Sequence, residues 1–107
     1  MQMRHVSVFR VKNECRNPEV IEHLAELLRA LSAQIPTITA CEVGIKPYPM
    51  PTAAPDGAVQ FYDLIQIISF ANEDDCDEYP ATDGHMNFLT ESQPYMDQVV
   101  ALDYPVE

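Results

Sequence analysis

M-R-H-V-S-V-F-R-V, residues 3 to 11, is the stretch that decides the predicted fold. Valine and phenylalanine are frequent and no turn residue interrupts it, so it predicts a β-strand. One face carries His5, Ser7, Phe9 and Val11, and the other carries Val6, Val8 and Arg10. Helices of a small single-sheet domain cover only one sheet face, so a second apolar face needs a partner. We expect a homodimer that packs through the sheet face opposite the helices; a central, moderately exposed strand is the alternative.

The clearest helical signal follows this strand. Asn17-Pro18-Glu19 supplies an N-cap, a proline at the first position and an acid in the first turn, and Pro36 ends the helix. Apolar residues recur between them at helical spacing: Val20, Ile21, Leu24, Leu27, Leu28, Leu31 and Ile35. This helix is expected to cover one face of the sheet.

Residues 37 to 45 and 61 to 70 predict the next two strands. Between them, residues 46 to 60 are rich in proline, and we expect an extended connection there. One face of the later strand carries Tyr62, Leu64, Gln66, Ile68 and Phe70. Gln66 is polar among apolar neighbours, so it needs a hydrogen-bond partner, a bound water or a ligand.

The last third of the sequence predicts two helices and a strand. Asn72 can cap a short acidic helix, and a second helix runs from Thr82 towards Pro94, with residues 95 to 97 adding a turn. Residues 98 to 105 then form the fourth strand. The order β-α-β-β-α-β predicts a ferredoxin-like α+β fold, with a four-stranded antiparallel sheet and helices on one face. At 107 residues the chain, 1 to 107, is expected to be a single domain.

Composition and charge exclude several classes of partner. Six Lys and Arg against 17 Asp and Glu give a net charge of −11, which opposes binding to nucleic acid or to an anionic membrane. The three cysteines lack a CxxC pair, and the acidic run 73 to 78 lacks the alternation and glycine of a calcium loop. We expect neither metal nor cofactor. No signal-peptide block or membrane-length apolar run occurs, so a cytoplasmic protein is expected.

Y-P-A-T-D-G-H-M-N-F, residues 79 to 88, is the stretch where we place the chemistry. Thr82 as N-cap would put His85 in the first helical turn, beside unpaired N–H groups and the positive end of the helix dipole. That field disfavours imidazolium, and a neutral imidazole can act as a general base. Tyr79, with an ordinary pKa of about 10, stays protonated and can donate a hydrogen bond to a carbonyl. Packing or surface hydrogen bonding near a helix end is the alternative role for both residues.

Five segments together carry a family resemblance: R-H-V-S-V-F at 4 to 9, Q-I-P at 34 to 36, Y-D-L-I-Q-I-I-S-F at 62 to 70, E-Y…H…F at 78 to 88, and V-V-A-L-D-Y at 99 to 104. In this order and spacing the chain resembles the stress-responsive α/β barrel (Dabb) family of dimeric α+β barrel proteins. The resemblance implies a homodimer whose two sheets build a central barrel. It also implies a small cavity between sheet and helices in each protomer.

The resemblance extends to plant polyketide cyclases of this family, in which a tyrosine and a histidine six residues apart are the catalytic pair. Tyr79 and His85 fall on those positions, and His5 falls on a first-strand histidine that points into the same cavity. His85 would then take a proton from a carbon next to a carbonyl, Tyr79 would hydrogen-bond the carbonyl oxygen, and His5 would orient or polarise the substrate.

Two departures from the family pattern concern the pocket. The common H-P-x-H becomes Thr82-Asp83-Gly84-His85, and positions that are aromatic in the plant cyclases read Ala25, Leu28 and Met96. A different pocket shape and a different small-molecule ligand are expected. The residues expected to bind the ligand are Ser7, Phe9, Leu24, Leu28, Gln66, Ile68, Phe88 and Met96.

Three functions remain open at this point. The first is a cofactor-free acid/base lyase or cyclase acting on a carbonyl-containing small molecule. The second is a non-catalytic dimer, stress-responsive or ligand-binding, in which the same residues only satisfy one another. The third is a monooxygenase of the wider dimeric barrel superfamily that works without haem or another cofactor, which the carboxy-terminal L-D-Y makes less attractive.

Overall fold

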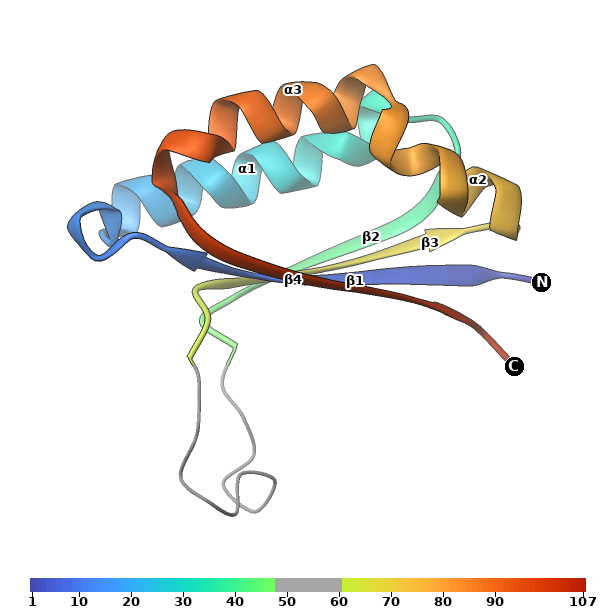
Figure 1. Ribbon diagram of the computed structural model, residues 1–107, viewed down its shortest axis with the longest axis horizontal. Coiled ribbons are helices and arrows are strands. Elements are labelled where there is room, and N and C mark those ends of the chain that lie inside the picture. Colours follow the sequence, from blue (N-terminus) through green and yellow to red (C-terminus); the bar gives the residue numbers. More distant parts are fainter. Residues whose placement is uncertain (48–60) are drawn as a thin grey trace, which may run out of the picture.

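The computed structural model describes residues 1–47 and 61–107, and almost all of the predicted proline-rich connection lies outside them. Four antiparallel strands form one sheet in the order β2-β3-β1-β4. They are β1 (Met3–Val11), β2 (Ile38–Ile45), β3 (Leu64–Phe70) and β4 (Met96–Pro105). The helices α1 (Pro18–Gln34), α2 (Glu73–Glu78) and α3 (Asp83–Ser92) all lie on one face of this sheet (Figure 1). The predicted ferredoxin-like α+β fold is confirmed.

Each α-helix begins at a side-chain cap that the sequence predicts. The side chain of Asn17 accepts from the backbone N–H of Val20 at 3.0 Å, and that of Asn72 accepts from Asp75 N–H at 2.8 Å. Thr82 Oγ1 accepts from His85 N–H at 3.3 Å. These bonds satisfy N–H groups that the first helical turn leaves without a backbone partner, so local sequence fixes where the helices start.

The core lies between α1 and the covered face of the sheet. The faces predicted for β1 and β3 are correct, because Phe9, Val11, Leu64, Ile68 and Phe70 are all buried against the helices. From α1, the buried residues are Ile21, Leu24, Ala25, Leu28 and Leu31. One apolar cluster therefore joins the helix and the sheet.

Two predicted strand boundaries are wrong, each for a local reason. β3 begins at Leu64 and not at residue 61, because the Asp63 side chain accepts the Val11 backbone N–H at 2.7 Å and the Arg16 Nε–H at 2.9 Å. Tyr62 is thus outside the strand, with Arg10 stacked over its ring. β4 begins at Met96 and not at residue 98, because Met96 already pairs with Val11. The helical turn predicted to include Met96 ends one residue earlier, as a 3-10 turn at Gln93–Tyr95.

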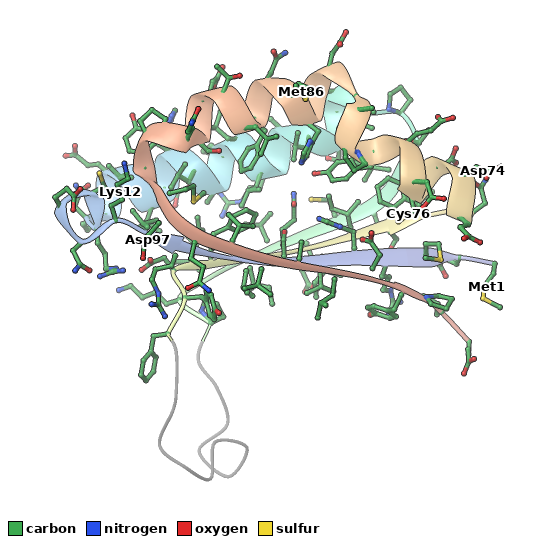
Figure 2. The ribbon with its side chains drawn as sticks, viewed as in Figure 1. Met1, Lys12, Asp74, Cys76, Met86 and Asp97 are labelled. Atoms are coloured by element: carbon green, nitrogen blue, oxygen red, sulfur yellow. The ribbon has the colours of Figure 1, made fainter. Side chains whose placement is uncertain are left out.

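The other sheet face has no helix over it. Strand register sets Val6 opposite Ile67 and Leu102, and Val8 opposite Ile65 and Val100, so these side chains form one continuous apolar surface. Leu102 is 67% exposed and Tyr104, at the edge of this surface, is 41% exposed. Figure 2 shows side chains projecting from the sheet on the side away from the helices. We call this surface, Val6, Val8, Ile65, Ile67, Val100, Leu102 and Tyr104, the uncovered face.

The described residues also include three cysteines. Cys15, Cys41 and Cys76 are free thiols. Within residues 1–47 and 61–107, no helix is long and apolar enough to cross a membrane, and no group of three His, Cys, Asp or Glu side chains is arranged to hold a metal ion.

Candidate active site

A cavity of about 510 Å³ lies between α3 and the sheet strands β1 and β4. The structure brings His5, Tyr79 and His85 together on its wall, although 80 residues of sequence separate the first from the last. The remaining lining residues are Ser7, Phe9, Gln66, Met86, Phe88, Leu89, Thr90, Ser92, Gln93, Met96, Val99 and Ala101. The wall is mostly apolar, and its polar groups are concentrated at a few positions.

Tyr79 is the centre of the polar cluster. It lies in a 3-10 turn (Tyr79–Ala81) between α2 and α3 and is only 3% exposed. Its ring centroid is 5.5 Å from that of Phe70, 5.2 Å from that of His5 and 4.7 Å from that of His85. Burial raises the pKa of the Tyr79 phenol above its ordinary value, and the nearby Cys41 and Asp103 raise it further. Tyr79 is therefore a neutral hydrogen-bond donor at physiological pH.

His85 is held in a single tautomer by the turn before α3. Its Nδ1 lies 3.0 Å from the carbonyl oxygen of Pro80, and a carbonyl can only accept, so Nδ1 carries the proton. Nε2 then has a free lone pair. Burial lowers the pKa of His85, proximity to His5 lowers it further, and the bond to Pro80 acts in the opposite sense. The lowered pKa of His85 agrees with the neutral imidazole predicted from the helix start, but the largest cause of the lowering is burial.

The first turn of α3 sits close to α1 because residue 84 has no side chain. A Cβ on Gly84 would lie 2.8 Å from Cγ1 of Ile35, which is closer than real Cβ atoms approach. Ile35 is itself buried at the end of α1. Gly84, at the variable position of the common family motif, thus sets the distance between the helices, and with it the position of the neighbouring His85.

His5 is oriented by Asp103, which the sequence analysis did not propose as a site residue. The two residues are direct partners in the β1–β4 ladder, and His5 Nδ1 lies 2.6 Å from Asp103 Oδ1. Burial raises the pKa of the Cys76 thiol to about 11, and the negative charge of Asp103 contributes to this shift. Cys76 lies on α2 near the sheet (Figure 2). The sequence signal for Asp103 was its alternation with Val99 and Ala101, but only the strand pairing connects it with His5.

The predicted ligand-binding residues divide into two groups. Five of them line the cavity: Ser7, Phe9, Gln66, Phe88 and Met96. Leu24, Leu28 and Ile68 do not belong to the described cavity lining, because they are fully buried in the core between α1 and the sheet. Helical and strand periodicity identifies residues that face inwards, but it does not distinguish a cavity wall from a packed core.

Several cavity residues were missed by the sequence analysis. Met86 and Leu89 come from α3 and Val99 from β4, and all three are substantially exposed. Their mixed apolar and polar surroundings in the sequence resemble those of ordinary surface positions, so no periodic signal identified them. In the structure they give the cavity an apolar border.

Chemically, the cluster offers a base, a donor and an oriented second imidazole. His85 Nε2 can accept a proton, the Tyr79 hydroxyl can stabilise a developing negative charge on oxygen, and His5 lies against the tyrosine ring. An apolar wall around them strengthens electrostatic interactions inside the cavity.

Comparison with known proteins places the chain among related folds. A family model described as the stress responsive A/B barrel domain, Dabb, matches residues 3–106. The Arabidopsis thaliana protein At3g17210 is 26% identical, with a TM-score of 0.81, over 98% of this chain and 95% of that one. A dimeric ferredoxin-like protein of unknown function from Bacteroides fragilis is 21% identical, with a TM-score of 0.73, over 98% and 96%.

An enzyme is also among the similar structures. The hydroxynitrile lyase from Passiflora edulis is 19% identical, with a TM-score of 0.77, over 99% of this chain and 94% of that one. A comparison with curated proteins found no match.

Proposed function

The chain belongs to the stress-responsive A/B barrel domain (Dabb) family, and on that basis we propose that it is a homodimeric, cofactor-free acid/base lyase or cyclase acting on a carbonyl-containing small molecule. The observation that carries the proposal is the convergence of His5, Tyr79 and His85 on one cavity. Passiflora hydroxynitrile lyase supports it, since that enzyme shows lyase chemistry on a similar fold. The three free thiols support a reducing compartment such as the cytoplasm.

In the proposed reaction, His85 Nε2 removes a proton from the carbon next to the substrate carbonyl. Negative charge then grows on the carbonyl oxygen, and the neutral Tyr79 hydroxyl donates a hydrogen bond to it. The α-carbon of the resulting enolate can attack a second carbonyl of the same molecule, which forms the carbon–carbon bond of a ring and leaves an alkoxide. Alternatively, the enolate forms a carbon–carbon double bond and expels a leaving group from its β-carbon. His85 returns its proton to the alkoxide or to the leaving group. His5, held by Asp103, packs against the tyrosine ring.

We also propose that the homodimer forms through the uncovered face. Support comes from its continuous apolar register and from similar structures that are described as dimeric. An exposed apolar surface of this kind is characteristic of a protein–protein interface. The catalytic cavity lies on the opposite side of the sheet, next to the helices, and so remains open in such a dimer.

The test is exchange of the α-protons of acetophenone for deuterium, followed by NMR in deuterated buffer. This measures proton removal directly and requires no knowledge of the natural substrate. His85→Ala should slow the protein-dependent exchange by about 10²–10⁴-fold, and Tyr79→Phe by about 10²–10³-fold.

Two matched variants control for general effects of these substitutions. His23 and Tyr95 pack edge to face at 6.0 Å on another part of the surface, outside the cavity lining described above. His23→Ala and Tyr95→Phe should therefore keep the exchange rate of the natural sequence. Equal rates in all four variants, or no acceleration over buffer, would refute the acid/base proposal and favour the non-catalytic, ligand-binding dimer.

A further inference from the structure

We propose that Ser7 is a specificity-determining residue that selects carbonyl compounds bearing a second oxygen, a hydroxyl about 7 Å from the carbonyl. The inference rests on the proposed function, because it takes the carbonyl to be bound at Tyr79 and His85. It adds a second polar contact at the other end of the ligand, and it defines the substrate class as hydroxylated ketones or aldehydes.

The first observation is a buried hydroxyl that lacks a partner. Ser7 is 2% exposed and lines the cavity, and its Oγ is the buried side-chain N or O atom without a hydrogen bond among the described residues. Buried polar groups in folded proteins are almost always hydrogen-bonded, and exceptions point to a functional contact or an unseen partner. A ligand oxygen in the cavity would supply the bond.

The second observation explains why Gln66, the polar residue paired with Ser7 across the ladder, does not satisfy its hydroxyl. The two residues are direct partners in the β1–β3 ladder. Gln66 Nε2, however, donates to the Leu28 carbonyl oxygen at 3.2 Å, which turns the amide nitrogen towards α1. The amide is held in place by this bond and does not rotate freely to pair with Ser7. The serine hydroxyl remains available on the cavity side.

The third observation is the spacing between the two polar positions. Side chains two residues apart on one strand face are separated by about 7 Å. His5 and Ser7 are such a pair on β1, and His5 lies against the Tyr79 ring, with 5.2 Å between centroids. A carbonyl held beside the Tyr79 and His5 rings therefore lies about 7 Å from Ser7. A benzene ring that carries the carbonyl and a hydroxyl at opposite positions spans roughly this distance.

The surroundings restrict what can bridge this distance. Phe9 and Phe88 meet edge to face at 5.9 Å beside Ser7, and Met96 adds a further apolar wall. An apolar or aromatic spacer between the two oxygens suits these walls. A charged group at Ser7 would lack a counter-charge among the described cavity residues, so the second oxygen is inferred to be a neutral hydroxyl.

The experiment compares two probes that differ by one hydroxyl, acetophenone and 4-hydroxyacetophenone. Their dissociation constants are measured by calorimetry on the full-length protein. The natural sequence should prefer 4-hydroxyacetophenone by about fivefold, the value of one neutral hydrogen bond. In Ser7→Ala the ratio of the two dissociation constants should fall to about one, while acetophenone should bind with an unchanged dissociation constant. Ser7→Cys keeps the side-chain volume but weakens the hydrogen bond, and should also lower the preference.

Ser92 provides the matched control. It is another buried serine of the cavity wall, but its hydroxyl already donates to the Leu89 carbonyl oxygen at 3.5 Å. Ser92→Ala should keep the fivefold preference. The inference is overturned if neither probe binds, if the natural sequence shows no preference, if the preference survives in Ser7→Ala, or if Ser92→Ala abolishes it.

His85→Ala separates this inference from the proposed function. The variant should lose proton exchange and retain the hydroxyl preference, because binding at Ser7 does not need the base. A protein that shows the Ser7-dependent preference without exchange would refute the acid/base reaction alone. Exchange without the preference would refute the role of Ser7 alone.

Discussion

Introducing a charge at Leu102 should dissociate the proposed dimer. Leu102 is the most exposed apolar residue of the uncovered face, at 67%, and lies opposite Val6 in the β1–β4 ladder. In Leu102→Glu the carboxylate would replace an apolar side chain within the proposed contact between the two sheets. Its solvation is lost only in the dimer, so the folded monomer should be little affected.

The expected loss of dimer stability follows from the exposed fraction of Leu102. Burying a whole leucine side chain stabilises by about 1.5–3 kcal/mol, so two-thirds of it contributes about 1–2 kcal/mol. A twofold interface contains the residue twice, which gives about 2–4 kcal/mol, or about 30- to 1000-fold in the dimer dissociation constant. The desolvation of two carboxylates adds to this loss, so these values are lower limits.

Sedimentation velocity over a range of protein concentrations measures the effect. The matched control is Leu89→Glu, since Leu89 is also exposed, at 45%, but lies on α3 on the other side of the sheet. The control should remain dimeric, and circular dichroism should show both variants folded. A folded Leu102→Glu protein with an unchanged dissociation constant, or dissociation of the control alone, would refute the assignment of the interface.

Two further predictions concern the titration of the site and the division between cavity and core. NMR titration should give His85 a pKa below its usual 6.5, because burial lowers it. The unfolded chain then binds the proton more readily than the folded protein, so stability should be lost as the pH falls from 6.5 towards the folded-state pKa. His85→Gln should remove this part of the pH dependence. A measured pKa above 6.5 for His85 would contradict the argument. Leu28→Ala should lower the free energy of unfolding by about 2–5 kcal/mol in urea titrations, because Leu28 is fully buried in the core. The half-buried Leu27 is the control, and Leu27→Ala should cost less.

Local sequence determined the elements of this protein. Each helix start depends on a capping residue a few positions from the group it satisfies, and each strand face depends on alternation within one segment. Asn17, Asn72 and Thr82 could therefore be assigned as caps, and the order of elements was sufficient to predict the ferredoxin-like fold. The strand ends were predicted less well, because the contact of Asp63 with Val11 joins residues 52 positions apart.

Tertiary structure alone decided which inward-facing residues line a cavity and which are buried in the packed core. Leu28 and Ser7 both face the interior, yet one is surrounded by core side chains while the other has an unpaired hydroxyl at the cavity wall. Asp103 meets His5 only through the register of β1 with β4. Such contacts depend on how distant segments pack and align, and no periodicity within a single segment carries that information.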